Sequence, residues 1–119
     1  MLAFGFATLL LSLPATAQGA PTQHSITVTW SETQGTDLAV GFNVYRGTTT
    51  GGPYIVLNAA PLPLATLNYI DTNGTGGTKY FYVVTAVDIS GFESGYSAEM
   101  SATFLANPAV PTAGTATAK

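Results

Sequence analysis

Between His24 and Phe104 the chain consists of short runs in which apolar and polar residues alternate, separated by turn-rich clusters. Successive side chains of a strand point to opposite faces of a sheet, so such alternation indicates strands with one buried face. No stretch shows the 3.6-residue apolar period and capping residues of a helix. Short strands with turns every ten or so residues are typical of an antiparallel sandwich or barrel, and we predict an all-β fold.

The predicted strands cover residues 26–30, 40–44, 54–57, 66–70, 79–87 and 96–104. The turn clusters 47–53, 71–77 and 88–91 are rich in Gly, Asp, Asn, Ser or Pro, the residues that tight turns favour. Alternation within these strands assigns one set of side chains to the core, and in the run 40–44 the inward set is Val40, Phe42 and Val44. The expected core residues are Trp30, Phe42, Val44, Tyr80, Tyr82 and Val84.

An uncharged apolar run covers residues 2–13 and is followed by Pro14 and the small residues of Ala15-Thr16-Ala17. The run is too short for a helix to span about 30 Å of hydrocarbon, and a small-x-small triplet suits signal peptidase. We therefore predict a signal peptide over residues 1–17 and a secreted or cell-surface location. The alternative is a buried N-terminal strand or helix.

The last segment, residues 106–119, is rich in Ala, Thr and Pro and has no aromatic residue. It has little apolar surface to bury, so we predict a tail or linker. The folded domain is then expected over residues 18–105.

The composition excludes several kinds of site. The chain has no cysteine, one histidine, three basic and six acidic residues. Disulfides, thiolate nucleophiles, Cys-ligated metals and multi-histidine metal sites are therefore excluded. Three cations are too few to bind a row of nucleic-acid phosphates, and attraction to an anionic membrane should be weak. We expect no cofactor, no nucleic-acid partner and no membrane span.

No convincing catalytic set is present either. His24 is the one candidate base, and it lies near Thr22 and Ser25 without a nucleophile elbow or an oxyanion loop. Most of the acidic residues lie in or beside predicted turns, where carboxylates cap backbone N–H groups. The glycine-rich loops lack the Lys-Ser/Thr ending of a phosphate loop. A calcium ion bound by Asp71 and Asn73 is an alternative, although the ligand spacing of an EF-hand is absent. We predict that the chain is not an enzyme. The acidic residues are Glu32, Asp37, Asp71, Asp88, Glu93 and Glu99.

Five segments together resemble the fibronectin type III domain in its bacterial extracellular form. They are HSITVTW from His24, GFNVYRGTTTGGPY from Gly41, NYIDT from Asn68, GTKYFYVVTAVD from Gly77 and SGFESGYSAEMSAT from Ser90. The resemblance implies a two-sheet Greek-key, immunoglobulin-like sandwich of about seven strands, with strands A, B and E in one sheet and C′, C, F and G in the other. It also implies that Trp30 is the core tryptophan of strand B. Tyr80 would form the tyrosine corner, its hydroxyl bonded to backbone upstream.

Strand A is expected to be short or missing, because only residues 18–23 lie between the predicted cleavage site and His24. One edge of strand B, residues 26–30, would then have unpaired backbone groups that can accept another strand. The chain's own N-terminal residues, its C-terminal tail or a partner could cover this edge.

Alternation also predicts an outward aromatic face on the larger sheet, formed by Tyr45, Phe81 and Val83. An apolar patch of this kind often marks a contact site, and flat aromatic rings suit stacking against sugars. The alternative is that these side chains stiffen the strand and meet a neighbouring domain.

The leading functional hypothesis is a non-catalytic exported or cell-surface module, a spacer or interaction domain with a protein or polysaccharide partner. The alternative is a glycan-binding accessory domain that uses the aromatic face. A hydrolase dependent on His24 or an acidic pair is the third hypothesis.

Overall fold

The computed structural model describes residues 24–32 and 38–118, and within these ranges all regular structure is β-strand. The predicted signal peptide (residues 1–17) lies outside the described residues, and so do residues 18–23, the segment in which strand A was expected to be short or missing. The strands are β1 (Ile26–Thr29), β2 (Ala39–Gly47), β3 (Ile55–Val56), β4 (Leu62–Pro63), β5 (Asn68–Asp71), β6 (Lys79–Asp88) and β7 (Met100–Thr103).

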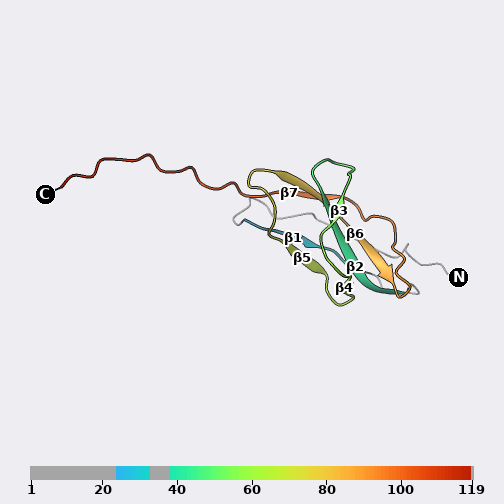
Figure 1. Ribbon diagram of the computed structural model, residues 1–119. Helices are drawn as coiled ribbons and strands as arrows, with labels where there is room; N and C mark the ends of the chain where they lie inside the picture. Colours follow the sequence, from blue (N-terminus) through green and yellow to red (C-terminus); the bar gives the residue numbers. More distant parts are fainter. Residues whose placement is uncertain (1–23, 33–37, 119) are drawn as a thin grey trace.

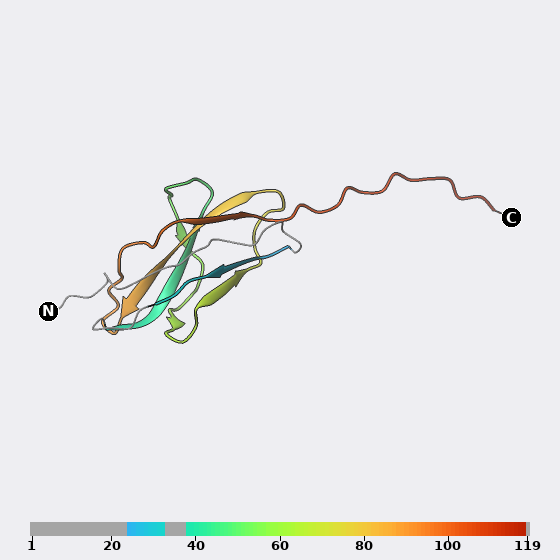
Figure 2. The same cartoon turned by 180° about the vertical axis from the view of Figure 1, so that it is seen from behind.

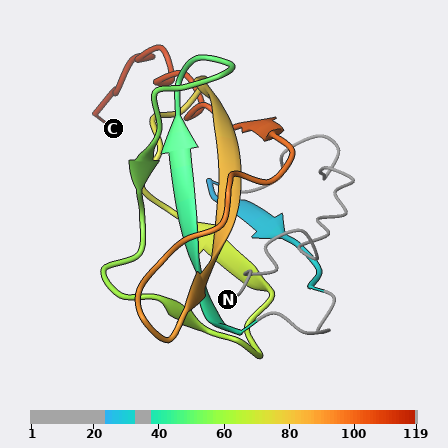
Figure 3. The same ribbon diagram turned by 90° about the vertical axis from the view of Figure 1, so that its right-hand side faces the viewer.

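The strands form two sheets that pack face to face. β1 and β5 pair antiparallel in the smaller sheet, while the larger has the order β3-β2-β6-β7, with β4 also paired to β2. Figure 3 shows β1 and β5 as a second layer behind the long strands β2 and β6. The predicted all-β sandwich is confirmed. β1 and β5 take the places of strands B and E, and β3, β2, β6 and β7 those of C′, C, F and G.

The core lies between the sheets and is built from alternating side chains. All six residues expected there are buried, and Phe42 and Val44 have no exposed surface. The rings of Trp30 and Phe42 meet edge to face with centroids 5.4 Å apart, which joins the smaller sheet to the larger one. Ile26, Val28, Ala86, Met100 and Phe104 complete this cluster.

The start of β2 departs from simple alternation. We predicted that Val40 faces inward with Phe42, but its side chain is 47% exposed. The pairing with β6 shifts register between Ala39 and Gly41, so Ala39 packs against the core instead. An irregularity of this kind reverses the parity of the residues before it, and the expectation for Val40 was wrong.

The edge of β2 that faces away from β6 pairs with two short strands and with one side chain, rather than with a single long strand. β3 and β4 pair with different parts of β2, and Asn58 lies between them. The Val44 N–H donates to Asn58 Oδ1 at 2.7 Å, and Asn58 Nδ2 donates to the carbonyl of Ala60 at 2.8 Å. A buried amide therefore completes the ladder where the chain turns away.

The last strand is shorter than predicted, because β7 begins at Met100 rather than at Tyr96. Two serines take over its role before that point. The Ser94 N–H donates to the carbonyl of Ala86 at 2.8 Å, and Ser94 Oγ accepts the Ala86 N–H at 2.9 Å. Ser97 makes the same pair of bonds to Val84, both at 2.9 Å. The edge of β6 is thus hydrogen-bonded without a regular strand beside it.

Beyond Phe104 the chain leaves the sandwich as an extended segment (Figures 1 and 2), and residues 106–118 are exposed without regular structure. His24, at the start of the described domain, lies at the same end, with its Nδ1 2.9 Å from the carbonyl of Leu105. In the described part of the chain, no helix is long and apolar enough to cross a membrane.

Candidate functional site

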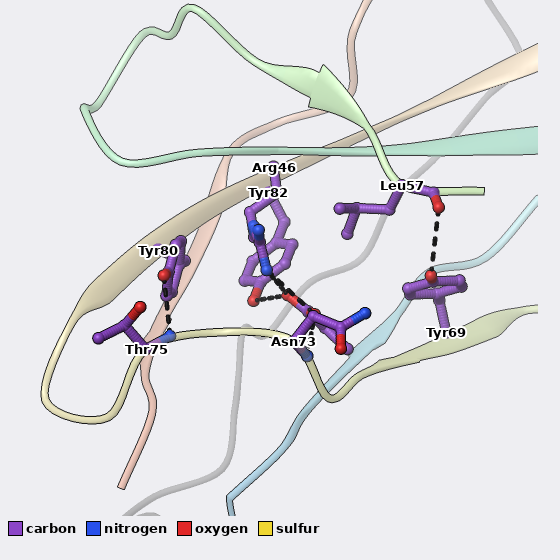
Figure 4. A network of polar contacts seen from close by, with 8 residues as sticks. Arg46, Leu57, Tyr69, Asn73, Thr75, Tyr80 and Tyr82 are labelled. Atoms are coloured by element: carbon purple, nitrogen blue, oxygen red, sulfur yellow. Dashed lines mark hydrogen bonds and ion pairs between the residues drawn. The ribbon is translucent and has the colours of Figure 1, made fainter. Parts of the chain in front are cut away.

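A charged network closes one end of the sandwich and joins its two sheets. Arg46 on β2 shares the inward parity of Phe42 and Val44, and its Nη1 lies 2.9 and 3.1 Å from the two carboxylate oxygens of Asp71 on β5. The Tyr82 hydroxyl donates to Asp71 at 2.7 Å, and the Asn73 N–H donates at 3.1 Å (Figure 4). Burial raises the pKa of Tyr82, and the hydrogen bond to Asp71 adds to this effect.

Tyr80 lies beside this network and contacts the backbone upstream of its strand. Its hydroxyl accepts the Thr75 N–H at 3.0 Å, as Figure 4 shows. This is the bond that the resemblance implied for a tyrosine corner, and it lowers the pKa of Tyr80. The Arg46 guanidinium lies 4.5 Å from the centre of the Tyr80 ring. The corner and the ion pair are therefore one structural unit.

Asp71 and Asp88, two of the carboxylates considered for metal binding or catalysis, have structural partners, and Asp37 lies outside the described residues. Asp71 is neutralised by Arg46, and Asp88 accepts the N–H groups of Ser90 and Phe92 within its turn, at 2.8 and 3.0 Å. Among the described residues, no three His, Cys, Asp or Glu side chains gather closely enough to hold a metal ion.

The predicted outward face of Tyr45, Phe81 and Val83 is only partly as expected. Tyr45 and Phe81 are partly exposed, and Lys79 Nζ lies 5.5 Å from the centre of the Phe81 ring. Val83 is only 2% exposed, so it offers no surface for binding. The expectation for Val83 was wrong, although the alternation of β6 does direct its side chain away from the core.

Three tyrosines, Tyr45, Tyr54 and Tyr96, are joined by ring contacts and form what we call the tyrosine bridge. The Tyr96 ring meets the Tyr45 ring with centroids 5.4 Å apart and the Tyr54 ring with centroids 5.1 Å apart, both edge to face. Because β6 lies between β2 and the segment that carries Tyr96, these contacts pass over the outward face of β6. The sequence pattern predicted Tyr45 as part of an outward aromatic face but did not assign Tyr54 or Tyr96 to it.

A glutamate anchors each outer tyrosine of the bridge. Glu93 accepts the hydroxyls of Tyr45 and Thr85 at 2.6 and 2.7 Å. Glu99 accepts the Tyr54 hydroxyl, and it also accepts the Thr50 hydroxyl at 2.6 Å and the Gly51 N–H at 2.8 Å. The second carboxylate thereby ties the β2–β3 loop to the segment before β7.

These bonds set the ionisation of both glutamates. Burial acts to raise the pKa of Glu93, but hydrogen bonds from Tyr45 and Thr85 outweigh it and hold the pKa below its ordinary 4.5. Hydrogen bonds from Thr50 and Tyr54 lower the pKa of Glu99. Both carboxyls are therefore ionised at neutral pH, and neither carries a proton to give to a substrate.

Tyr45 and Tyr54 are expected to ionise late when the pH is raised. Burial, with the nearby glutamates, raises the pKa of each from 10.0 to about 12. The pKa of each tyrosine is higher in the folded state than in the unfolded state. The contribution of these two groups to the free energy of unfolding is therefore fully present below pH 10.0 and is lost as the pH rises toward about 12. Ultraviolet titration of tyrosinate should show a late step that the Tyr45→Phe, Tyr54→Phe double variant lacks. The same late step in that variant would contradict the assignment.

An open hollow lies along one side of the bridge. Its volume is about 320 Å³, and its lining combines aromatic, hydroxyl and carboxylate groups. The lining residues are Tyr45, Thr85, Glu93, Ser94, Gly95 and Tyr96. His24, the candidate base, is exposed two residues before β1 and is not among them.

Comparison with solved structures identifies the family. A fibronectin type III-like protein from Clostridium thermocellum is 35% identical to the chain, which covers 84% of that protein with a TM-score of 0.58. The chain belongs to the fibronectin type III family. No protein-family model matches it. A β-1,2-glucanase from Parabacteroides distasonis is 25% identical over 85% of this chain and 13% of the enzyme, with a TM-score of 0.65.

The curated relatives of this fibronectin type III domain are large enzymes. An amylopullulanase from Thermoanaerobacterium saccharolyticum is 33% identical over 83% of the chain, and exoglucanase B from Cellulomonas fimi is 32% identical over 80%. The chain spans only 7% and 8% of these two proteins. A domain of this type is therefore one small part of each enzyme.

Proposed function

We propose that the chain is a non-catalytic exported module, a spacer or interaction domain that serves enzymes acting on polysaccharides. The observation that carries the proposal is the size relation to its relatives: the chain matches 7% of an amylopullulanase and 8% of an exoglucanase. A segment of that size corresponds to one accessory domain. A polysaccharide at the cell surface, or a protein bound to it, is then the partner to expect.

The polar groups of the described residues support a structural rather than a catalytic role. Glycoside hydrolysis needs two carboxyl groups, one of which keeps its proton through a raised pKa. Glu93 and Glu99 both have lowered pKa values and both hold tyrosine hydroxyls. Asp71 is committed to Arg46. We therefore expect no hydrolysis by this domain.

The extended segment after Phe104 supports a spacer role. Residues 106–118 are exposed and rich in Ala, Thr and Pro, a composition that keeps a chain extended without a core of its own. Such a segment separates the sandwich from whatever it is joined to or bound to. We propose residues 18–105 as the domain and residues 106–119 as the linker.

Expression of the full chain in a bacterial host tests the proposal. Export predicts a protein outside the cytoplasm whose intact mass lacks residues 1–17, and the same preparation should release no reducing ends from starch, pullulan or β-glucan. Full-length protein confined to the cytoplasm would contradict export. Release of reducing ends that a Glu93→Gln, Glu99→Gln variant loses would contradict the non-catalytic role.

A further inference from the structure

The tyrosine bridge holds one aromatic ring in solvent beside an open hollow. Tyr96 is 56% exposed, and the hollow of about 320 Å³ runs along it. We propose that this surface binds a neutral polysaccharide chain, with the Tyr96 ring as the platform on which a sugar ring stacks. The inference rests on the proposed function and adds to it a site and a ligand class.

The Tyr96 ring is held in place before any ligand arrives. The Tyr45 and Tyr54 rings both contact it edge to face, and their hydroxyls are fixed by Glu93 and Glu99. A ring that is already ordered loses little conformational entropy on binding. Its face carries the negative part of the aromatic quadrupole, which favours contact with the weakly positive C–H groups on one face of a sugar ring.

The hollow adds polar groups that suit a ligand rich in hydroxyls. Glu93 supplies carboxylate oxygens that can accept hydrogen bonds from sugar hydroxyls, and it is fixed in position by Tyr45 and Thr85. An aromatic surface with a few fixed polar groups is the usual make-up of a small-molecule site. The bridge is therefore more than an apolar patch.

Charge selects between neutral and acidic polysaccharides. Glu93 and Glu99 place two negative charges at the bridge. Of the lysine and arginine side chains of the described residues, Arg46 pairs with Asp71 and Lys79 lies beside the Phe81 ring, and neither lines the hollow. An acidic polymer would be repelled without a compensating cation. The ligand is thus a neutral glycan and not a polyuronate.

Affinity gel electrophoresis of the full chain tests this site. The probes are soluble starch, mixed-linkage β-glucan and polygalacturonate, each cast separately into the gel. We expect at least one neutral glucan to retard the wild-type protein and polygalacturonate not to do so. Tyr96→Ala should weaken retardation about tenfold, equivalent to about 1.4 kcal/mol. Tyr96→Phe keeps the ring and should behave as wild type.

Ile70→Ala is the matched control, since Ile70 is 55% exposed on β5 of the other sheet. Thermal unfolding of each variant checks that it is folded. The proposal is overturned if neither neutral glucan retards the wild type, if Tyr96→Ala migrates as wild type does, or if polygalacturonate retards the protein equally. Each of these results would leave export and the lack of hydrolysis intact, so the two proposals fail separately.

Discussion

Replacing Arg46 with Met is expected to lower the free energy of unfolding by about 3–5 kcal/mol, the usual cost of breaking a buried ion pair. The Asp71 side chain is 2% exposed and would lose its only cationic partner among the described residues. The Tyr82 hydroxyl and the Asn73 N–H would still donate to Asp71, but neither neutralises its charge. Urea unfolding followed by tryptophan fluorescence measures the change.

A second variant separates the charge from the packing. Arg46→Met with Asp71→Asn removes both charges but keeps an oxygen that can accept from Tyr82 and Asn73, so it should be more stable than Arg46→Met alone. Lys79→Met is the control, because Lys79 is an exposed cation whose loss should cost less than about 0.5 kcal/mol. Equal stability of Arg46→Met and wild type would show that the pair adds nothing to the fold.

The position of Arg46 in the alternating pattern indicated a buried ion pair, although the composition did not. Arg46 stands two residues after Val44 and four after Phe42, so alternation places it on the inward side of β2. An inward cation requires a buried anion, and Asp71 ends β5 on the opposite sheet. Which acidic residue takes that place depends on how the two sheets stack, and strand periodicity does not specify this.

The core was predictable because the strands that form it, β1, β6 and β2 after its register shift, each send alternate side chains between the sheets. The outward face of the larger sheet was harder to predict, because alternation gives the direction of a side chain but not the residues that cover it. Alternation along β6 directs Val83 away from the core, and its side chain is nevertheless only 2% exposed. Tyr54 and Tyr96 begin the predicted strands 54–57 and 96–104 but lie outside the observed β3 and β7, so alternation did not predict where their side chains lie.

Replacing Trp30 with Ala is expected to cost about 3–5 kcal/mol, the range for truncating a large buried aromatic. Trp30 is 4% exposed and packs against Phe42 across the core. Small domains have a total stability of about 5–15 kcal/mol, so much of the protein's stability would be lost. Because Trp30 is the sole tryptophan, urea unfolding is followed here by circular dichroism. Thr29→Ala, at an exposed neighbouring position, is the control and should change stability by less than about 0.5 kcal/mol.

Trp30→Phe tests whether packing or hydrogen bonding makes this residue important. The indole N–H is buried and has no hydrogen-bond partner among the described residues. Phe fills less volume but removes that donor, whose burial costs about 1–3 kcal/mol, so the two effects should offset each other to within about 1 kcal/mol. If Trp30→Phe lowers the free energy of unfolding as much as Trp30→Ala does, this expectation is contradicted. The indole N–H would then have a hydrogen-bond partner in the folded protein, and packing alone would not explain the contribution of Trp30 to stability.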